Sequence, residues 1–287
     1  KNVNYLFEAS VGGGIPIIRP MQRCLTANHL TQITGILNGT TNYILNRMID
    51  GGLDFATALK EAQELGYAEA NPAADVEGID ACRKVCILAD IAYGDNVAPE
   101  KVETEGITAI TLQDVAYAEQ ADSVVKLLGR TVLQEDGTFY AFVAPHFVKK
   151  SSPLACVTGV FNGILVTGDM LGDAMFYGQG AGKLATASAV AADVIDCAVH
   201  KNTRRSIGWG DGSKNLVRSL DTFASNWYIR VQGADAADKL AQVFPNSKVL
   251  EPVQAEEAAV LTDVLTTAEM NEKKAQLGNV LGCMRLL

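Results

Sequence analysis

The residues best suited to chemistry lie in one short stretch of the sequence, residues 64–94. Sixteen consecutive positions within it contain a cluster of charged side chains: Glu69, Asp75, Glu77, Asp80, Arg83 and Lys84. Carboxylates and a lysine are residue types that hold charged groups and transfer protons. The stretch then becomes apolar, so we expect the charged cluster to lie at the mouth of a buried helix.

This helix is predicted from apolar residues that recur with helical spacing over 76–92, with Asp75 as its N-cap. Asp80 and Lys84 are four residues apart and therefore share one face. The simplest interpretation of such a pair is a solvated salt bridge, worth roughly a few tenths of a kcal/mol. However, the small residues of the helix favour close packing, and the polar loop at 71–74 can fold back over the face. We therefore expect the pair to face a pocket.

The elements that must position this helix follow from the rest of the pattern, which predicts an α+β fold. Residues 1–203 are expected to form a mixed or mostly antiparallel sheet covered by helices. Strands are predicted at 3–8, 30–37, 124–133, 138–149 and 161–167. Helices are predicted at 15–25, 38–48, 55–65, 111–120 and 183–199. The dipeptide Asp136-Gly137 indicates a hairpin turn between two of the strands.

The last part of the chain has a different order of elements. A basic segment that contains glycine and serine, residues 201–213, marks a boundary, and we divide the chain into residues 1–203, a linker at 204–221 and residues 222–287. Strand, helix, strand, strand, helix and strand are predicted in turn at 226–231, 236–244, 248–252, 258–265, 268–276 and 280–286. This βαββαβ order is typical of a small ferredoxin-like domain.

Composition indicates a globular protein and argues against several classes of partner. The 287 residues suggest about two domains, and 48% hydrophobic residues can bury a sizeable core. A net charge of −9 at pH 7 argues against nucleic acid or an anionic membrane as a partner. No signal peptide or membrane span is expected, because no apolar run reaches about 18 residues. The scattered cysteines indicate reduced thiols and a cytoplasmic location. The histidines lie far apart in the sequence, so we expect no zinc site.

Four blocks of the sequence resemble the signature blocks of homoserine dehydrogenases, in the same order. The blocks are FEASVGGGIPIIRP (7–20), ILNGTTNYIL (36–45), GYAEANPAADVEGIDACRKV (66–85) and FYGQGAGKLATASAVAAD (176–193). The resemblance implies an oxidoreductase of threonine and methionine biosynthesis, which interconverts L-aspartate 4-semialdehyde and L-homoserine with NADP(H) or NAD(H). The family's amino-terminal dinucleotide-binding domain has no counterpart in this chain, so we expect the chain alone to be inactive.

The resemblance also implies roles for individual residues around the charged cluster. Lys84 would give a proton to the alkoxide that hydride transfer leaves, or would stabilise it as a fixed positive charge. The ammonium of a small amino-acid substrate would be held by carboxylates with help from one tyrosine, the residues being Glu69, Asp80, Asp75 and Tyr67. Thr40 would line the same pocket. Its neighbour Asn38 is predicted only as a helix N-cap.

Glycine-rich loops are implied to bind the cofactor and a cation. By resemblance, Gly66, Gly180 and Gly182 would contact the nicotinamide cofactor, although a helix C-cap explains Gly66 equally well. The loop over 178–182 lacks the spacing of a Rossmann fingerprint. Main-chain carbonyls would hold a monovalent cation, Na⁺, and by match these belong to Glu8, Val11, Gly13 and Ile15. A simple strand-to-helix turn is the alternative interpretation of the glycines at 12–14.

Partners and regulation are also implied by resemblance. Residues 222–287 resemble the ACT domain through which amino acids such as threonine regulate related enzymes, but 233–237 depart from the usual Asp-x-Pro-Gly. A sensor, a dimerising domain and a vestigial domain therefore all remain open. We expect a homodimer or higher oligomer, because apolar strands at 124–149 would otherwise be exposed. The alternative to an enzyme is a non-catalytic module that binds an amino acid, which the presence of Lys84 in an intact signature block disfavours.

Overall fold

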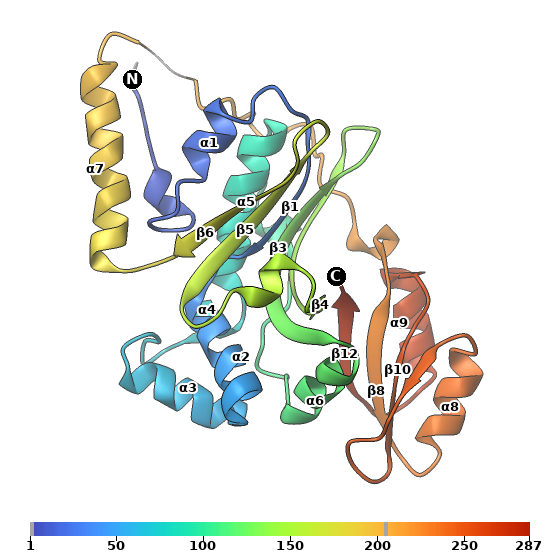
Figure 1. Ribbon diagram of the computed structural model, residues 1–287. Helices are drawn as coiled ribbons and strands as arrows, with labels where there is room; N and C mark the ends of the chain where they lie inside the picture. Colours follow the sequence, from blue (N-terminus) through green and yellow to red (C-terminus); the bar gives the residue numbers. More distant parts are fainter. Residues whose placement is uncertain (1–2, 204–205) are drawn as a thin grey trace.

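A computed structural model describes residues 3–203 and 206–287 and places a large mixed sheet at the centre of the molecule (Figure 1). Among the described residues its ten strands follow the order β6-β5-β1-β3-β4-β12-β8-β10-β9, and β2 pairs with β4. Their bounds are β1 (Leu30–Ile36), β2 (Glu103–Thr104), β3 (Ser123–Leu133), β4 (Phe139–Lys149), β5 (Phe161–Gly168), β6 (Gly172–Gln179), β8 (Trp227–Gln232), β9 (Lys248–Leu250), β10 (Glu257–Leu261) and β12 (Val280–Leu286). Strands β7 (Ala224–Ser225) and β11 (Leu265–Thr266) pair separately.

Several helices begin at residues whose side chains cap the first turn. Their bounds are α1 (Ile18–Arg23), α2 (Gly39–Gly51), α3 (Phe55–Glu64), α4 (Ala73–Val76), α5 (Ile79–Tyr93), α6 (Leu112–Gln120), α7 (Lys183–Val199), α8 (Ala236–Val243) and α9 (Thr267–Ala275). Side-chain oxygens of Asn38, Asp54 and Thr111 accept hydrogen bonds from the first turns of α2, α3 and α6. Helix α5 packs against β3 and β4 and buries Val85 and Leu88 in the main core. No helix of the described residues could span a membrane.

Much of the predicted α+β fold is confirmed. Strands β1, β3, β4 and β5 and helices α2, α3, α6 and α7 agree with the predicted bounds to within about two residues at most ends. The predicted hairpin turn is present, with Gly137 at φ 80°. The expectation that the apolar strands at 124–149 are exposed is wrong, because β3 and β4 lie inside the sheet and are largely buried. The homodimer thus stays a prediction without that support.

The predicted strand at 3–8 is wrong. Residues 3–7 are irregular, and Glu8–Ser10 form the 3₁₀ helix η1. The Glu8 carboxylate accepts hydrogen bonds from the backbone N–H groups of Ile17, Ile18 and Arg19 at 2.7, 2.8 and 2.8 Å. This cap fixes the start of α1, so the helix is shorter than the predicted 15–25. Strand β6 was not predicted, because glycines interrupt its pattern.

The C-terminal residues form the predicted βαββαβ order, with the antiparallel strand order β12-β8-β10-β9 and helices α8 and α9 (Figure 1). The sheet is continuous with the rest of the molecule, because β12 pairs in parallel with β4 through Arg285↔His146 and Leu286↔Phe147. Arg285 lies over the ring of Trp227, with its Cζ 4.3 Å from the centroid. Residues 204 and 205 of the predicted linker lie outside the described residues, and the division into domains stays a prediction.

A buried ion network also joins the two parts of the chain. Arg230 of β8 donates from Nε to Asp114 Oδ1 of α6 at 3.1 Å and from Nη1 to Glu257 Oε2 of β10 at 3.0 Å. Side-chain exposure is 4% for Arg230, 1% for Asp114 and 2% for Glu257. Two tyrosine hydroxyls donate to the same carboxylates. The charges are therefore paired and hydrogen-bonded, as burial requires.

We expect Arg230→Met to lower the free energy of unfolding by about 3–5 kcal/mol, because two buried carboxylates lose their cation. Urea unfolding measures this change. Arg218→Met is the control, since the Arg218 side chain is 39% exposed and its Nη1 lies 3.8 Å from Asp136 Oδ2. This substitution should change the free energy of unfolding by no more than about 0.5 kcal/mol. Similar small effects of both substitutions would show that the network does not hold the parts together.

Candidate active site

A connected polar cluster forms where α2, α4 and α5 meet. Lys84 Nζ donates to Asp80 Oδ2 at 2.6 Å and to the carbonyl oxygen of Leu37 at 2.8 Å. Asn38 Nδ2 donates to the same Asp80 oxygen at 3.0 Å and to Asp75 Oδ1 at 2.7 Å. Two carboxylates are thus linked through one amide, and one of them also holds the ammonium.

This geometry differs from the solvated salt bridge that is the simplest interpretation of the sequence. The Lys84 side chain is 18% exposed and that of Asp80 is 33% exposed. A backbone carbonyl from the end of β1 fixes the ammonium in addition to Asp80. The lysine is therefore held in one place at the rim of the core.

A glycine between α4 and α5 brings the two carboxylates together. Gly78 has φ 82°, in the left-handed region that glycine adopts easily, and it ends one helix and starts the next. In a single continuous helix, Asp75 and Asp80 would point about 140° apart, at about 100° per residue. The predicted continuous helix with Asp75 as N-cap is thus wrong. Glu77 lies exposed in the break, away from the shared face.

The carboxylates influence one another electrostatically. Partial burial raises the pKa of Asp75, and the charges of Asp80 and Glu69 raise it further. The hydrogen bond from Asn38 and the charge of Lys84 act in the opposite direction. Glu69, which is exposed, therefore belongs to the same electrostatic cluster. Excess negative charge of this kind favours a bound cationic group.

The loop that carries Tyr67 and Glu69 is held by α2. Thr40 Oγ1 donates to the carbonyl oxygen of Tyr67 at 2.7 Å. The rings of Tyr43 and Tyr67 have centroids 5.0 Å apart, and Tyr43 OH donates to Glu61 at 2.6 Å. Thr40 and Tyr67 therefore lie beside each other, with the Thr40 hydroxyl already engaged by this loop.

The three glycines that the sequence associates with a cofactor differ in their surroundings. Gly66 at φ 75° and Gly182 at φ 119° have no heavy atom within 4 Å of the position where a Cβ would lie. At Gly180, by contrast, a Cβ would lie 2.1 Å from Cγ of Asn162. Close packing against Asn162 therefore leaves no room for a side chain at Gly180, whereas Gly66 and Gly182 border open space.

The glycine loop at 11–14 packs against the glycine loop at 178–182. Gly12 and Gly13 have φ 73° and 55°, and a Cβ on Gly13 would lie 2.3 Å from the carbonyl oxygen of Gly180. Gly14 N donates to the carbonyl oxygen of Gln179 at 3.1 Å. The described residues contain no group of three His, Cys, Asp or Glu side chains that could hold a metal ion.

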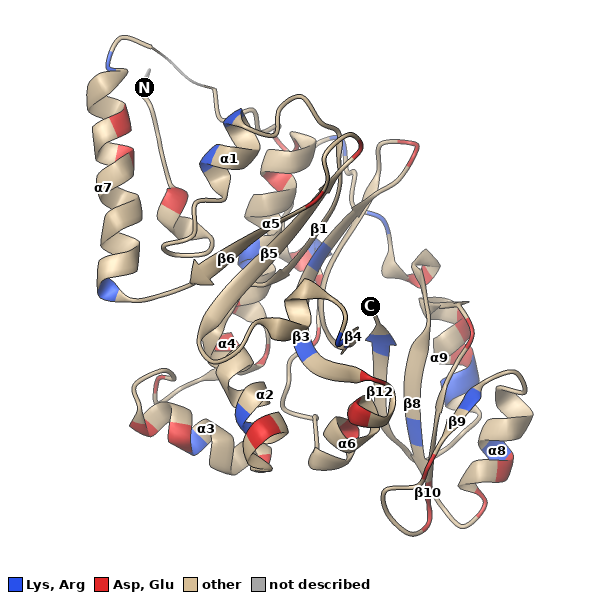
Figure 2. Ribbon diagram, in the orientation of Figure 1, with Lys and Arg blue, Asp and Glu red and all other residues tan. Residues whose placement is uncertain are grey.

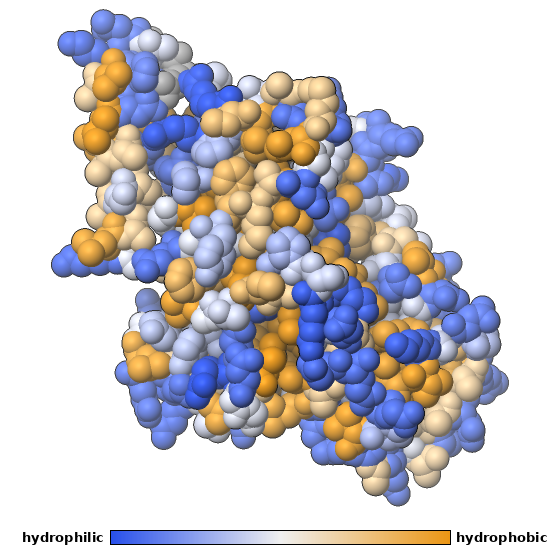
Figure 3. Space-filling view, viewed as in Figure 1, coloured by the Kyte–Doolittle hydropathy of each residue, from blue (hydrophilic) through white to orange (hydrophobic). Residues whose placement is uncertain are grey.

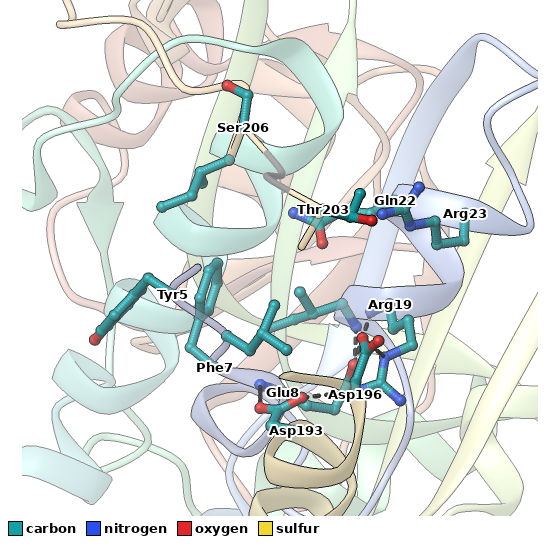
Figure 4. A pocket seen from close by; sticks show the side chains of 13 residues that line it. Tyr5, Phe7, Glu8, Arg19, Gln22, Arg23, Asp193, Asp196, Thr203 and Ser206 are labelled. Atoms are coloured by element: carbon teal, nitrogen blue, oxygen red, sulfur yellow. Dashed lines mark hydrogen bonds and ion pairs between the residues drawn. The ribbon is translucent and has the colours of Figure 1, made fainter. Parts of the chain in front are cut away.

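A pocket of about 360 Å³ lies elsewhere, between the amino-terminal segment, α1 and the C-terminal half of α7 (Figure 4). Arg19 Nη2 donates to Asp193 Oδ1 at 2.7 Å, and the backbone N–H of Glu8 donates to Asp193 Oδ2 at 2.9 Å. Figure 2 shows acidic residues in the upper half of α7. The charges of the pocket pair with one another and hold α7 in place, so we assign the chemistry to the cluster around Lys84.

Sequence reasoning missed two residues that shape this cluster. It assigned Asn38 only as the N-cap of α2, a role that the structure confirms together with the bridge to both carboxylates. It also passed over Gly78, although a glycine within a helical pattern is a known signal of a break. The predicted residues Thr40, Tyr67, Glu69, Asp75, Asp80 and Lys84 do lie around one site.

A lysine fixed beside clustered carboxylates is an arrangement typical of enzymes that act on small charged molecules. The homoserine dehydrogenase family matches residues 16–195, and the chain belongs to this family. The homoserine dehydrogenase of Synechocystis sp. is 51% identical over 197 residues, covering 68% of this chain and 46% of the relative. That of Helicobacter pylori is 38% identical over 277 residues, covering 96% and 64%. The chain thus spans about half the length of the curated relatives it matches.

Solved structures agree with this assignment. A homoserine dehydrogenase from Thiobacillus denitrificans has a TM-score of 0.85 and 36% identity, covering 98% of this chain and 69% of that one. A hyperthermophilic archaeal homoserine dehydrogenase mutant in complex with NADPH has a TM-score of 0.58 and 30% identity, covering 67% and 55%.

The raised pKa of Asp75 gives a stability test. A carboxyl whose folded pKa lies above its unfolded value costs stability as pH rises through the folded pKa. We therefore expect Asp75→Asn to gain stability relative to the wild type as pH rises from 4 to 7, measured as a shift in Tm. Asp54→Asn is the matched control, because hydrogen bonds from Thr57 lower the pKa of the Asp54 carboxyl. The Tm of Asp54→Asn relative to the wild type should fall as pH rises. A Tm difference between Asp75→Asn and the wild type that stays constant from pH 4 to 7 would contradict the assignment.

Proposed function

We propose that the protein to which this chain belongs interconverts L-aspartate 4-semialdehyde and L-homoserine with NADPH or NADH. The observation that carries the proposal is the Lys84 ammonium, held by Asp80 and the Leu37 carbonyl. Family membership supports the substrate and the reaction, and the NADPH complex of the archaeal relative supports the cofactor.

Each residue of the cluster has a role that its position supports. The substrate ammonium binds to the carboxylates of Asp80 and Glu69, with Asp75 adding negative charge. The cofactor supplies a hydride to the aldehyde carbon when it is bound. Lys84 then stabilises the alkoxide oxygen and gives it a proton. Asn38 holds the carboxylates of Asp75 and Asp80 in position through its two hydrogen bonds.

Helix α7 supports the proposal that a nucleotide-binding part packs beside the site. Leu184, Val194 and Val199 are 83%, 63% and 69% exposed, and Figure 3 shows hydrophobic side chains along this helix. Apolar surface of this kind favours burial against another part of a protein. Gly182 lies at the start of the same helix, so a cofactor held there would approach the catalytic cluster from the side of α7.

Three further assignments belong to the proposal. We place Na⁺ on main-chain oxygens of the loop that contains Glu8, Val11, Gly13 and Ile15, because the left-handed Gly12 and Gly13 make this loop tight. We assign residues 222–287 as ACT-like from their strand order.

We expect a homodimer, and sedimentation that shows a monomer at micromolar concentration would contradict it. Inhibition of the full-length enzyme by threonine would identify residues 222–287 as a sensor rather than a dimerising or vestigial unit.

Substitutions of Lys84 in the full-length protein separate binding from chemistry. We expect Lys84→Ala to lower kcat by about a thousandfold or more, because it removes charge stabilisation that is greatest in the transition state. Lys84→Arg keeps the charge but cannot give up its proton, so retained activity would identify an electrostatic role. Glu69→Gln should raise KM for homoserine. A kcat for Lys84→Ala within about tenfold of the wild type, less than about 1.4 kcal/mol, would remove the catalytic assignment.

We expect the chain by itself to show no steady turnover of homoserine and to bind NADPH weakly. The physical reason is that contacts to the pyrophosphate and ribose come from a dinucleotide-binding domain. NADPH absorbance measures turnover, and fluorescence titration measures binding. The control is a longer protein that joins this chain to a dinucleotide-binding domain of the family. Sustained turnover by the chain alone would disprove the expectation.

A further inference from the structure

Lys126 of β3 is a buried cation that the proposed chemistry does not use. It is 1% exposed, and burial lowers its pKa to about 8. In the described part of the chain its ammonium donates to neutral oxygens: the carbonyl of Val157 at 2.6 Å, Asn42 Oδ1 at 3.1 Å and Asn46 Oδ1 at 3.4 Å. Burial of an ammonium without a bonded carboxylate costs free energy, so its retention needs an explanation.

The partners of Lys126 connect α2 to a loop that we call the wedge, residues 157–162. Asn42 Nδ2 lies within hydrogen-bond distance of the carbonyl oxygens of Val157, Gly159 and Phe161, at 3.2, 3.0 and 3.2 Å. Lys126 binds both this asparagine and Val157. Lys126 and Asn42 therefore bind several backbone carbonyl oxygens of the wedge. We call this group of hydrogen bonds the knot.

The wedge contacts both the start of α2 and the loop at 178–182. On one side, a Cβ on Gly39 would lie 2.5 Å from the carbonyl oxygen of Val160, so the wedge contacts the residue next to Asn38. On the other side, Asn162 contacts Gly180 of the loop that leads to Gly182. The Asn162 amide is buried without a hydrogen-bond partner among the described residues. Phe161 and Asn162 belong to β5 and pair with Gln179 and Gly178 of β6. The knot therefore fixes the part of the wedge that precedes β5, through the carbonyl oxygens of Val157 and Gly159.

We propose that Lys126 is a positioning residue that sets the distance between the substrate-binding start of α2 and the cofactor-facing loop at 178–182. The inference rests on the proposed function. Lys126 does not touch the reacting atoms, and it acts through Asn42 and the wedge. Because hydride transfer depends steeply on the distance between donor and acceptor, a small displacement of the wedge should slow chemistry more than binding.

The first test needs no catalytic activity and uses this chain. In Lys126→Met, hydrogen exchange of the amides at 39–42 and 157–162 should become about tenfold faster or more, because the knot opens locally. Lys273→Met is the control, since Lys273 also donates to a backbone carbonyl, that of Val243 at 2.8 Å, but within the C-terminal residues. If Lys126→Met does not fold, Asn42→Ala opens the same knot. Unchanged exchange in these segments would overturn the inference.

The second test uses the full-length enzyme and isolates positioning from stability. For the folded Lys126→Met enzyme we expect kcat lowered at least about tenfold, KM for homoserine within about threefold of the wild type, and a larger kinetic isotope effect when deuterated NADPH reduces L-aspartate 4-semialdehyde. A merely structural role would leave kcat per folded enzyme and the isotope effect unchanged, and that result would overturn the proposal. Absence of turnover in the wild type would instead refute the proposed function, while the exchange experiment would still decide the role of Lys126.

Discussion

The hairpin of β3 and β4 is the constraint on which the rest of the molecule depends. Its strands pair without interruption from Ser123↔Lys149 to Leu133↔Phe139. Strand β1 pairs with one side of the hairpin, β2 and β12 pair with the other, and α5 packs across it. Lys84 lies on α5, and its ammonium binds the carbonyl of Leu37, the residue after β1. The position of this ammonium therefore depends on how α5 and β1 sit on the hairpin.

Electrostatics at the site reflects a balance between function and stability. Asp75 and Asp80 share one amide donor, and the negative charges around Asp75 raise its pKa. A protein selected only for stability would separate these charges or pair each with its own cation. In the proposed function a cationic group of the substrate joins these carboxylates, and its positive charge would relieve the repulsion between them.

Local rules predicted much of the fold, because the relevant forces act over a few residues. Caps such as Asn38 and Asp54, and the turn at Gly137, are recognisable from single residues and their neighbours. The errors arose where a distant or unusual contact decided the structure. The Glu8 carboxylate reaches residues nine to eleven positions away, and Gly78 breaks a pattern that is otherwise helical. The role of Lys126 was invisible, since an isolated lysine in a strand pattern gives no sign of its partners.

The connection between β4 and β12 has a mechanical consequence. Its parallel pairing involves two residue pairs, Arg285↔His146 and Leu286↔Phe147, in the middle of the sheet order. Arg285 also lies over the ring of Phe142 of β4, with its Cζ 5.2 Å from the centroid, so the short seam resists separation but offers little torsional stiffness. The ion network around Arg230 lies away from the seam and provides a second point of attachment. Gln120 also exchanges hydrogen bonds with the backbone of Glu251, and Tyr140 OH lies 2.8 Å from Thr222 Oγ1. Residues 222–287 are therefore attached at several separate points, and no single rotation leaves all of them intact.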